Sequence, residues 1–154
     1  MEITSQDALI VVDVQNGFCP GGALPVPEGD AVIPVIQAIA GRFEHILLTQ
    51  DWHPAGHCSF ASSHLGRKPF ELDPVSGERL WPDHCVQGTH GAEIHAALQL
   101  PRAELILRKG FRQKVDSYSA FFENDHTTPT GLDGYAEERG FRRFFFAGLA
   151  FDFC

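Results

Sequence analysis

Short, uninterrupted apolar runs are the feature of this sequence that most restricts its fold. Ala8–Val12 reads Ala-Leu-Ile-Val-Val, and comparable runs occur at His45–Thr49, Glu104–Arg108 and Arg143–Ala147. A continuous apolar run of this length is typical of a strand that is buried on both faces. Such burial occurs mainly in parallel sheets that helices cover on both sides. The runs therefore predict four strands of such a sheet.

Helical segments separate these runs. We predict helices over Asp30–Phe43, Ala92–Leu98 and Leu132–Arg139, with Asp30 and Thr130 as the N-caps of the first and the third. Pro34 fits the first helix only if it falls in the first turn, where a backbone N–H is not needed. Strands that alternate with helices predict an α/β fold, a three-layer, doubly wound and mainly parallel sheet with helices on both faces.

The length and charge of the chain limit the possible classes of protein. The 154 residues suit a single domain, 1–154, and 12 Lys and Arg against 20 Asp and Glu give a formal charge of −8. Without a basic run, this balance argues against a nucleic-acid-binding protein, because phosphate neutralisation supplies much of such affinity. No apolar run reaches the length of a membrane span. We therefore expect a small-molecule partner, with no nucleic acid and no membrane.

The N-terminal segment and the cysteines together predict a cytoplasmic protein. The segment Met1–Asp7 is acidic and lacks the basic start and the apolar stretch of a secretory signal. The cysteines, which show no Cys-x-x-Cys spacing, are Cys19, Cys58, Cys85 and Cys154. This pattern argues against a structural zinc site or a redox motif, so we expect reduced thiols.

Reactive side chains follow each predicted strand. Asp13 follows the first strand, Asp51 and His53 follow the second, Lys109 follows the third, and Cys154 lies just beyond the fourth. Ligands of open parallel sheets bind outside the carboxyl ends of the strands, which meet at one edge. We therefore expect these side chains to form one site.

An acid, a cation and a thiol at one edge indicate nucleophilic catalysis. The thiol of Cys154 must become a thiolate to attack, and Asp13 could accept its proton and return it to a leaving group. Lys109 could lower the pKa of the thiol and keep Asp13 ionised. Alone, Asp13 would be better explained as a turn cap and Lys109 as a solvated surface residue. Together with Cys154 at matching strand ends, they favour the catalytic interpretation.

The segment Asp51-Trp52-His53 carries two metal-competent side chains on the same side of an extended chain. His84 could supply a third ligand, and one Asp with two His leaves open positions, as a catalytic metal site requires. Zn²⁺ suits these donors, and Fe²⁺ or Mn²⁺ would accept them. His57 is a further ligand or a hydrogen-bonded neighbour. The remaining histidines, which we expect to be surface or hydrogen-bonded residues, are His45, His64, His90, His95 and His126.

Five motifs occur in order along the chain: Val12-Asp13-Val14-Gln15-Asn16-Gly17-Phe18-Cys19, Asp51-Trp52-His53-Pro54, Trp81-Pro82-Asp83-His84-Cys85-Val86, Arg108-Lys109-Gly110 and Phe151-Asp152-Phe153-Cys154. With them the chain resembles the nicotinamidase/pyrazinamidase family of the isochorismatase-like cysteine hydrolase superfamily. The likeness runs from Ala8 to Cys154. The resemblance implies metal-dependent hydrolysis of nicotinamide to nicotinate and ammonia, a step of NAD salvage, and hydrolysis of pyrazinamide-type analogues. The implied reaction passes through a thioester intermediate.

The resemblance also implies roles for individual residues. Asp13, Lys109 and Cys154 match the catalytic triad. Asp51, His53 and His84 match the ligands of one divalent metal, which binds the pyridine nitrogen. Phe18 and Trp81 match the residues that sandwich the substrate ring, while Leu24 and Tyr118 match positions at the pocket edge. The peptide bond between Leu149 and Ala150 matches a cis bond that directs the N–H groups of Ala150 and Cys154 into an oxyanion hole.

The sequence departs from the family at two places. Gly17 stands where the family usually has Asp, which could loosen the loop that carries Phe18. Members of the family continue past the nucleophile through further helices and strands, so we expect the domain to be incomplete at its C-terminus.

Two other functions remain open at this point. One is a related amidohydrolase that acts on carbamoyl or ureido compounds, although such enzymes generally lack the Asp-x-His…His site. The other is a catalytically inactive metal-binding module of the same fold. Homo-oligomers are common for such folds, but the sequence shows no exposed apolar helix face that argues for one.

Overall fold

The computed structural model of the protein describes residues 2–154, and its centre is a four-stranded sheet. The strands are β1 (Asp7–Val12), β2 (His45–Asp51), β3 (Leu105–Lys109) and β4 (Arg143–Gly148). Their order in the sheet is β3-β2-β1-β4, and every neighbouring pair is parallel. All six residues of β1 are buried, because this strand has neighbours on both sides and helices on both faces. The predicted parallel sheet is confirmed.

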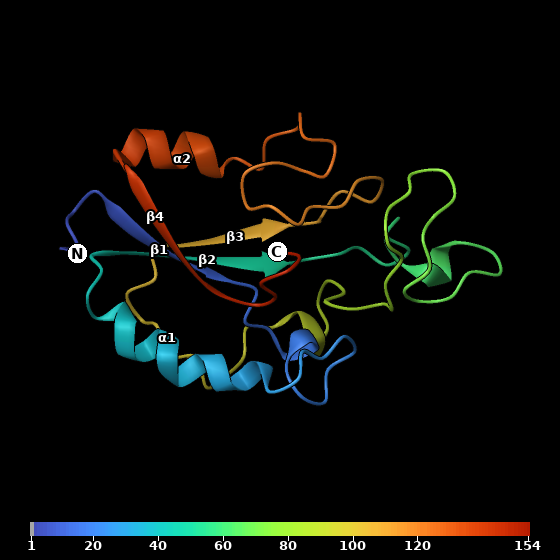
Figure 1. Ribbon diagram of the computed structural model, residues 1–154, viewed down its shortest axis with the longest axis horizontal. Helices are drawn as coiled ribbons and strands as arrows, with labels where there is room; N and C mark the ends of the chain where they lie inside the picture. Colours follow the sequence, from blue (N-terminus) through green and yellow to red (C-terminus); the bar gives the residue numbers. More distant parts are fainter. Residues whose placement is uncertain (1) are drawn as a thin grey trace.

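Two helices cover opposite faces of the sheet: α1 (Val32–Ala40) lies on one side and α2 (Leu132–Arg139) on the other (Figure 1). Alternate residues of β1 divide between them, because successive side chains of a strand point to opposite faces. Leu9 and Val11 pack into the core on the α1 side, with Ile33 and Ile36. On the α2 side, the cluster contains Ala8, Ile10, Val12, Leu132 and Ala136. This arrangement confirms the predicted three layers.

The first helix begins later than predicted. Asp30 lies in a 3₁₀ turn, Gly29–Ala31, and the N-cap of α1 is Ala31, which makes no side-chain capping bond. The prediction of Asp30 as the cap was therefore wrong. Pro34 falls in the first turn of α1, where the backbone N–H groups have no partner within the helix, as the sequence required.

The cap predicted for α2 is displaced by one residue. Gly131, with φ of 103°, is the N-cap, since that left-handed conformation suits glycine. The Thr130 hydroxyl instead donates to the carbonyl of Ala120 and accepts, at 3.4 Å, from the N–H of Leu132.

The helix predicted over Ala92–Leu98 is absent, and the prediction was wrong. Only a 3₁₀ turn, His90–Ala92, forms there. Ile94 then makes an antiparallel bridge with Gln15, and the N–H of His95 donates to the carbonyl of Val14 at 2.9 Å. The chain that leaves β1 thus offers hydrogen-bond partners to this segment, which replace those of a helix.

The connection from β2 to β3, residues 52–104, first extends beyond the carboxyl ends of the strands and then returns on the α1 side of the sheet to the start of β3 (Figure 1). Isolated bridges tie this connection together, including His53 to Val86 and Phe60 to Trp81. None of the helices in residues 2–154 has the length and apolarity that a bilayer span needs. The carboxyl ends of the strands and this connection together enclose the site described next.

Candidate active site

The residues predicted at the strand ends lie together. Asp13 directly follows β1, Asp51 and Lys109 are the last residues of β2 and β3, and Cys154 follows the turn after β4. One carboxylate oxygen of Asp13, one of Asp51 and the sulfur of Cys154 all lie within 4.8 Å of one another. Because the strands are parallel, four segments far apart in the sequence deliver these groups to one edge.

Lys109 is the centre of this cluster and is 1% exposed. Its Nζ lies 2.8 Å from Asp13 Oδ2 and 3.5 Å from Cys154 Sγ. The same ammonium donates to Asp51 Oδ1 and, at 3.0 Å, to the carbonyl of Ser117. The two buried carboxylates raise the pKa of Lys109 in spite of its burial, so the lysine is charged.

Asp13 is fully buried in a left-handed turn, with φ of 47°. Its Oδ1 accepts from the Thr49 hydroxyl at 2.6 Å, and its N–H donates to that oxygen at 3.1 Å. Apart from the ion pair with Lys109, Asp13 Oδ2 has no hydrogen-bond partner in the described chain. Burial raises the pKa of Asp13, and the Lys109 charge only partly opposes this. The carboxylate is therefore well placed to take up a proton.

Burial also dominates at Cys154. It raises the pKa of the thiol well above the ordinary value, and the favourable charge of Lys109 does not outweigh it. Lys109 does lower the pKa of the thiol, as predicted, but burial raises it by more, and the sequence did not reveal how deeply the sulfur is buried. A thiol of this kind needs a neighbouring base to become a nucleophile, and Asp13 is the adjacent base.

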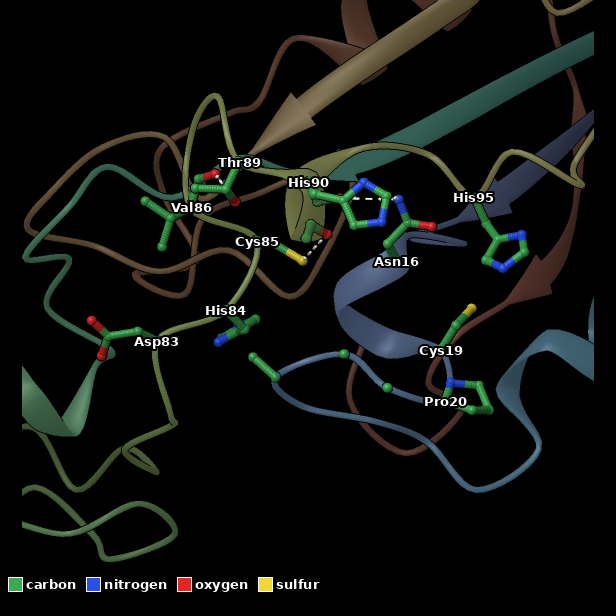
Figure 2. Close-up of a pocket in the computed structure, with 14 residues that line it drawn as sticks. Asn16, Cys19, Pro20, Asp83, His84, Cys85, Val86, Thr89, His90 and His95 are labelled. Carbon is green, nitrogen blue, oxygen red and sulfur yellow. Dashed lines mark hydrogen bonds between the residues drawn. The ribbon is translucent and has the colours of Figure 1, made fainter.

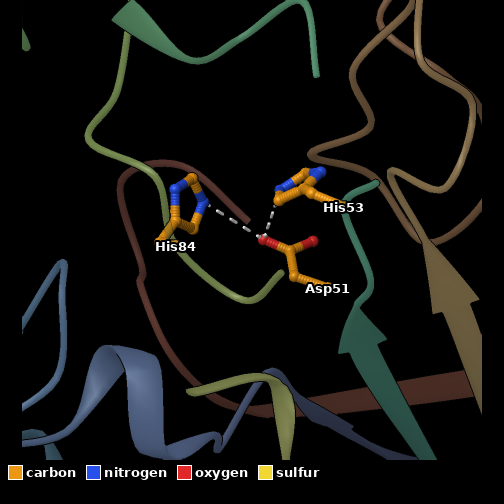
Figure 3. A group of neighbouring side chains, drawn as sticks. All are labelled: Asp51, His53 and His84. Atoms are coloured by element: carbon orange, nitrogen blue, oxygen red, sulfur yellow. Dashed lines mark ion pairs between the residues drawn. The ribbon is translucent and has the colours of Figure 1, made fainter. Parts of the chain in front are cut away.

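Asp51, His53 and His84 form a second group beside Lys109 (Figure 3). Asp51 Oδ2 lies 3.5 Å from His53 Nε2 and 3.8 Å from His84 Nε2. The backbone of His53 bonds to Cys85 and Gln87, and this pairing places His84 opposite His53. Burial raises the pKa of Asp51, but Lys109 and the two histidines outweigh that effect, so the carboxylate is ionised.

The chemistry of this group fits a divalent metal. His53 Nδ1 donates to the carbonyl of Gly110 at 2.9 Å, and His84 Nδ1 donates to the carbonyl of Pro82 at 2.8 Å. Both rings therefore direct Nε2 toward Asp51, and because Nδ1 is engaged as a donor, Nε2 is the atom that each ring can offer to a metal. One carboxylate and two imidazoles match the ligand set of catalytic sites with open positions.

His57 does not join this group. Its Nδ1 accepts from the Ser59 hydroxyl at 2.7 Å, while its Nε2 lies 3.0 Å from the carbonyl of Arg112. Its ring lies against that of His53, with 4.3 Å between the centroids. With both ring nitrogens engaged, His57 supports His53 by packing, which is the second of the two roles that the sequence left open.

A cavity of about 350 Å³ opens above the thiol. The predicted pocket residues Phe18, Leu24, Trp81 and Tyr118 all line it, together with Asp51, His84, Ala150 and Cys154. Trp81 Nε1 donates to the Tyr118 hydroxyl at 2.9 Å, and this bond fixes the indole ring in the wall. The cavity therefore joins aromatic walls to both the thiol and the metal-competent group.

The turn after β4 contributes Ala150 and Cys154 to the lining of this cavity. The peptide bond between Leu149 and Ala150 is cis, as the resemblance implied. Within residues 2–154, the N–H groups of Ala150 and Cys154 have no hydrogen-bond acceptor. Both residues line the cavity beside the thiol, so these two donors are free to bind an oxygen of a ligand.

A second cavity, of about 530 Å³, also has His84 in its lining (Figure 2). Asn16, His90 and His95 line it, and Asn16 Nδ2 donates to the carbonyl of His90 at 3.0 Å. His90 is exposed at the surface, while His45 bonds to Glu104 at 3.1 Å. These histidines are surface or hydrogen-bonded residues, as expected.

Gly17 is closely packed in the loop that carries Phe18, which argues against the loosening predicted there. Both residues are buried. A Cβ at Gly17 would lie 2.8 Å from Cys85 Sγ and 2.9 Å from the carbonyl of Gly91. The missing side chain is therefore what lets this turn pack closely against residues 85–91.

Among the residues of the site that sequence reasoning missed are Asp116, Phe153 and Gly110. Asp116 and Phe153 line the cavity, and Gly110 provides the carbonyl that orients His53. Phe153 lies within the motif quoted for Cys154, which could have indicated it, whereas Asp116 lies outside the quoted motifs. Gly110 acts through its backbone carbonyl, and a role of a backbone group cannot be inferred from the residue type.

The site can be compared with known proteins. Residues 7–154 match the isochorismatase domain family. A nicotinamidase from Acinetobacter baylyi is 54% identical over 156 residues, which cover 100% of this chain and 73% of the relative. A nicotinamidase from Escherichia coli is 42% identical over 153 residues, which cover 96% of this chain and 71% of the relative.

Solved structures of nicotinamidases and pyrazinamidases also match this chain. A nicotinamidase and pyrazinamidase of Acinetobacter baumannii matches with a TM-score of 0.96 and 56% identity, over 98% of this chain and 74% of that one. The L. infantum protein PnC1, in complex with nicotinate, matches with a TM-score of 0.86 and 41% identity, over 100% and 72%. A Pyrococcus horikoshii pyrazinamidase in complex with zinc matches with a TM-score of 0.74 and 37% identity, over 97% and 73%.

Proposed function

Because this chain belongs to the isochorismatase domain family, we propose that it is an amidohydrolase that converts nicotinamide to nicotinate and ammonia. The observation that carries the proposal is the position of Lys109. Its ammonium contacts the thiol of Cys154, the carboxylate of Asp13 and the carboxylate of Asp51 within one buried cluster. Nucleophile, base and metal-competent group thus belong to one site, beside a cavity with aromatic walls.

The first half of the reaction forms a bond to sulfur. Asp13 takes the proton of the Cys154 thiol, and the sulfur attacks the carboxamide carbon. Asp13 Oδ2, whose one described partner is the Lys109 ammonium, and the contact of Lys109 with both groups support this proton transfer. The oxygen of the tetrahedral intermediate would bind the N–H groups of Ala150 and Cys154, and one donor of this kind contributes about 2.7–4 kcal/mol to barrier lowering.

The second half regenerates the thiol. The carbon–nitrogen bond breaks, and the proton on Asp13 leaves with the amine as ammonia. A water molecule then adds to the thioester, with Asp13 accepting one of its protons. The carbon–sulfur bond breaks, nicotinate is released, and the proton returns from Asp13 to the sulfur of Cys154.

Asp51, His53 and His84 would hold the metal. When bound there, a divalent ion supplies a Lewis-acidic position for the ring nitrogen of the substrate. We propose zinc, because the imidazole and carboxylate donors suit it and the Pyrococcus horikoshii relative was solved with zinc. Phe18 and Trp81 would enclose the aromatic ring and so orient the carboxamide toward Cys154.

Two alternatives from the sequence are less well supported. The relatives at 54% and 42% identity are nicotinamidases, which favours nicotinamide over carbamoyl or ureido substrates. Burial of the thiol, Asp13 and Lys109 in one contacting cluster costs stability, which favours a catalytic role over an inactive module.

The proposal predicts a specific substrate preference. Supplied with Zn²⁺, the purified protein should release equal amounts of ammonia and nicotinate from nicotinamide. Benzamide, which lacks the ring nitrogen, should react roughly 10²-fold more slowly or worse, because a polar position of the site would lose its partner. Enzymatic ammonia detection and chromatography of the acid measure both products. Faster turnover of an N-carbamoyl amino acid than of nicotinamide would instead establish the carbamoyl alternative.

A substitution at Gly110 should weaken metal binding. Gly110 has φ of 62°, and a Cβ there would lie 2.4 Å from His53 Cε1. Gly110→Ala must therefore displace the His53 ring, and loss of such a supporting contact costs about 10–100-fold in metal affinity. Titration of the metal-free protein with Zn²⁺ against a chromogenic chelator measures this affinity.

The matched control is Gly66→Ala. Gly66 has a similar φ of 74°, but a Cβ there has no neighbour within 4 Å. This variant carries the same backbone strain and should bind Zn²⁺ like the parent protein. Equal affinities for the two variants would show that Gly110 does not position His53.

A further inference from the structure

Gln15 has no role in the mechanism above, although its side chain is fully buried beside the site. It follows the point where β1 leaves the sheet. The last pair between β1 and β2 is Val11 with Leu48, while β2 continues to Asp51. On the other side, β3 pairs with β2 as far as Asp51 and Lys109. The end of β2 therefore lacks a strand on the β1 side.

The side-chain amide of Gln15 fills this gap. Asp51 N–H donates to Gln15 Oε1 at 2.8 Å, and Gln15 Nε2 donates to the carbonyl of Asp51 at 2.9 Å. In a strand, the N–H and C=O of one residue point the same way, and here both point toward the missing strand. The next residue, Trp52, bonds to Lys109 on the opposite side at 2.9 Å. Gln15 thus replaces a peptide group of β1.

Only a primary amide of this length meets the requirement. The contact needs an acceptor and a donor side by side, and the second Nε2 hydrogen bonds to the carbonyl of Ala92 at 2.8 Å. A carboxylate would place an acceptor against the Asp51 carbonyl. An apolar side chain would leave two buried backbone groups of Asp51 without partners.

We propose that Gln15 is a positioning residue that fixes the backbone of Asp51 and thereby aims its carboxylate. Asp51 Oδ2 faces His53 and His84, and Oδ1 accepts from Lys109, so a rotation of this backbone would disturb both groups. The inference rests on the proposed function, because aiming Asp51 matters to a metal only if these three side chains bind one. Gln15 acts through Asp51 and does not itself touch the substrate.

Gln50 offers a matched control. It is also a buried amide, and its Nε2 donates to the same carbonyl of Ala92, at 2.7 Å. Its Oε1 accepts from Arg108 Nε at 3.3 Å. Its side chain makes no hydrogen bond to the backbone of Asp51 in the described chain. Replacement of Gln50 therefore measures the loss of stability that follows when a buried hydrogen bond to the Ala92 carbonyl is removed, without a change at Asp51.

The test compares Gln15→Met, Gln50→Met and the parent protein. Each metal-free protein is titrated with Zn²⁺ against a chromogenic chelator, and the midpoint of thermal unfolding is measured in the same buffer. We expect Gln15→Met to lower Zn²⁺ affinity by about 10–100-fold and Gln50→Met by less than about threefold, although both variants lose thermal stability. If Gln15 had only a structural role, the two variants would have similar Zn²⁺ affinities.

Equal Zn²⁺ affinities for the two variants would overturn the proposal. If Gln15→Met does not fold, Gln15→Asn serves in its place, because its amide is one methylene too short to reach both groups of Asp51. Nicotinamide turnover by the parent protein is measured in parallel. A parent protein that binds Zn²⁺ but does not release ammonia would contradict the proposed function and leave the metal comparison valid.

Discussion

Cys154→Ala should abolish ammonia release from nicotinamide, with a fall in kcat of roughly 10⁵-fold or more. The reason is that the Cys154 sulfur would form the covalent intermediate, and no other thiol lines the substrate cavity. Aromatic walls, metal-competent residues and Lys109 all remain in this variant. Zn²⁺ binding should therefore stay close to that of the parent protein, which separates loss of chemistry from loss of fold.

The matched control for this variant is Cys58→Ala. Cys58 is half-buried, its burial raises the pKa of the thiol to about 11, and it is not among the residues that line the cavity. The control should keep parent activity within a few-fold. Ammonia release by Cys154→Ala at more than a tenth of the parent rate would contradict the thioester mechanism.

Lys109→Met should reduce both activity and stability. Its ammonium lies between two buried carboxylates, and a methionine of similar length would leave Asp13 and Asp51 facing each other without a cation. Removing one partner of a buried ion pair costs about 3–5 kcal/mol in the free energy of unfolding. Loss of its charge beside the thiol and Asp13 should lower kcat/KM by at least about 10²–10³-fold, the effect of losing one preorganised electrostatic contact.

Urea denaturation measures the stability change, and steady-state kinetics on nicotinamide measure the second effect. Lys114→Met is the control, because Lys114 is exposed, and its substitution should change the free energy of unfolding by less than about 0.5 kcal/mol. A folded Lys109→Met protein with parent kcat/KM would remove Lys109 from the mechanism and leave it as a structural ion pair.

The sheet could be predicted from sequence because its signal is local. Each strand is an apolar run, and each predicted start or end lies within two residues of the observed one, as for β2, predicted over His45–Thr49 and observed over His45–Asp51. The family resemblance drawn from five motifs is confirmed by the match over residues 7–154. Parallel pairing then follows from alternation with helices, whereas the strand order came only from the structure.

Predictions that depended on local capping or periodicity fared worse. Ala92–Leu98 has a helical pattern, but Ile94 pairs with Gln15 instead. Lys109 lowers the pKa of Cys154 as expected, but burial of the sulfur, which the sequence did not reveal, raises it by more. In each case a contact with a distant segment outweighed the preference of the local sequence.

The sequence by itself determined which chemical groups the site contains, since residue type and position after a strand are local properties. It placed Asp13, Lys109 and Cys154 at strand ends and indicated Asp51, His53 and His84 as metal-competent. Only the tertiary structure decided how they are oriented. The Gly110 carbonyl sets the His53 tautomer, and the Gln15 amide replaces a missing strand beside Asp51. These contacts join backbone groups from separate segments, and backbone groups are the same at every residue.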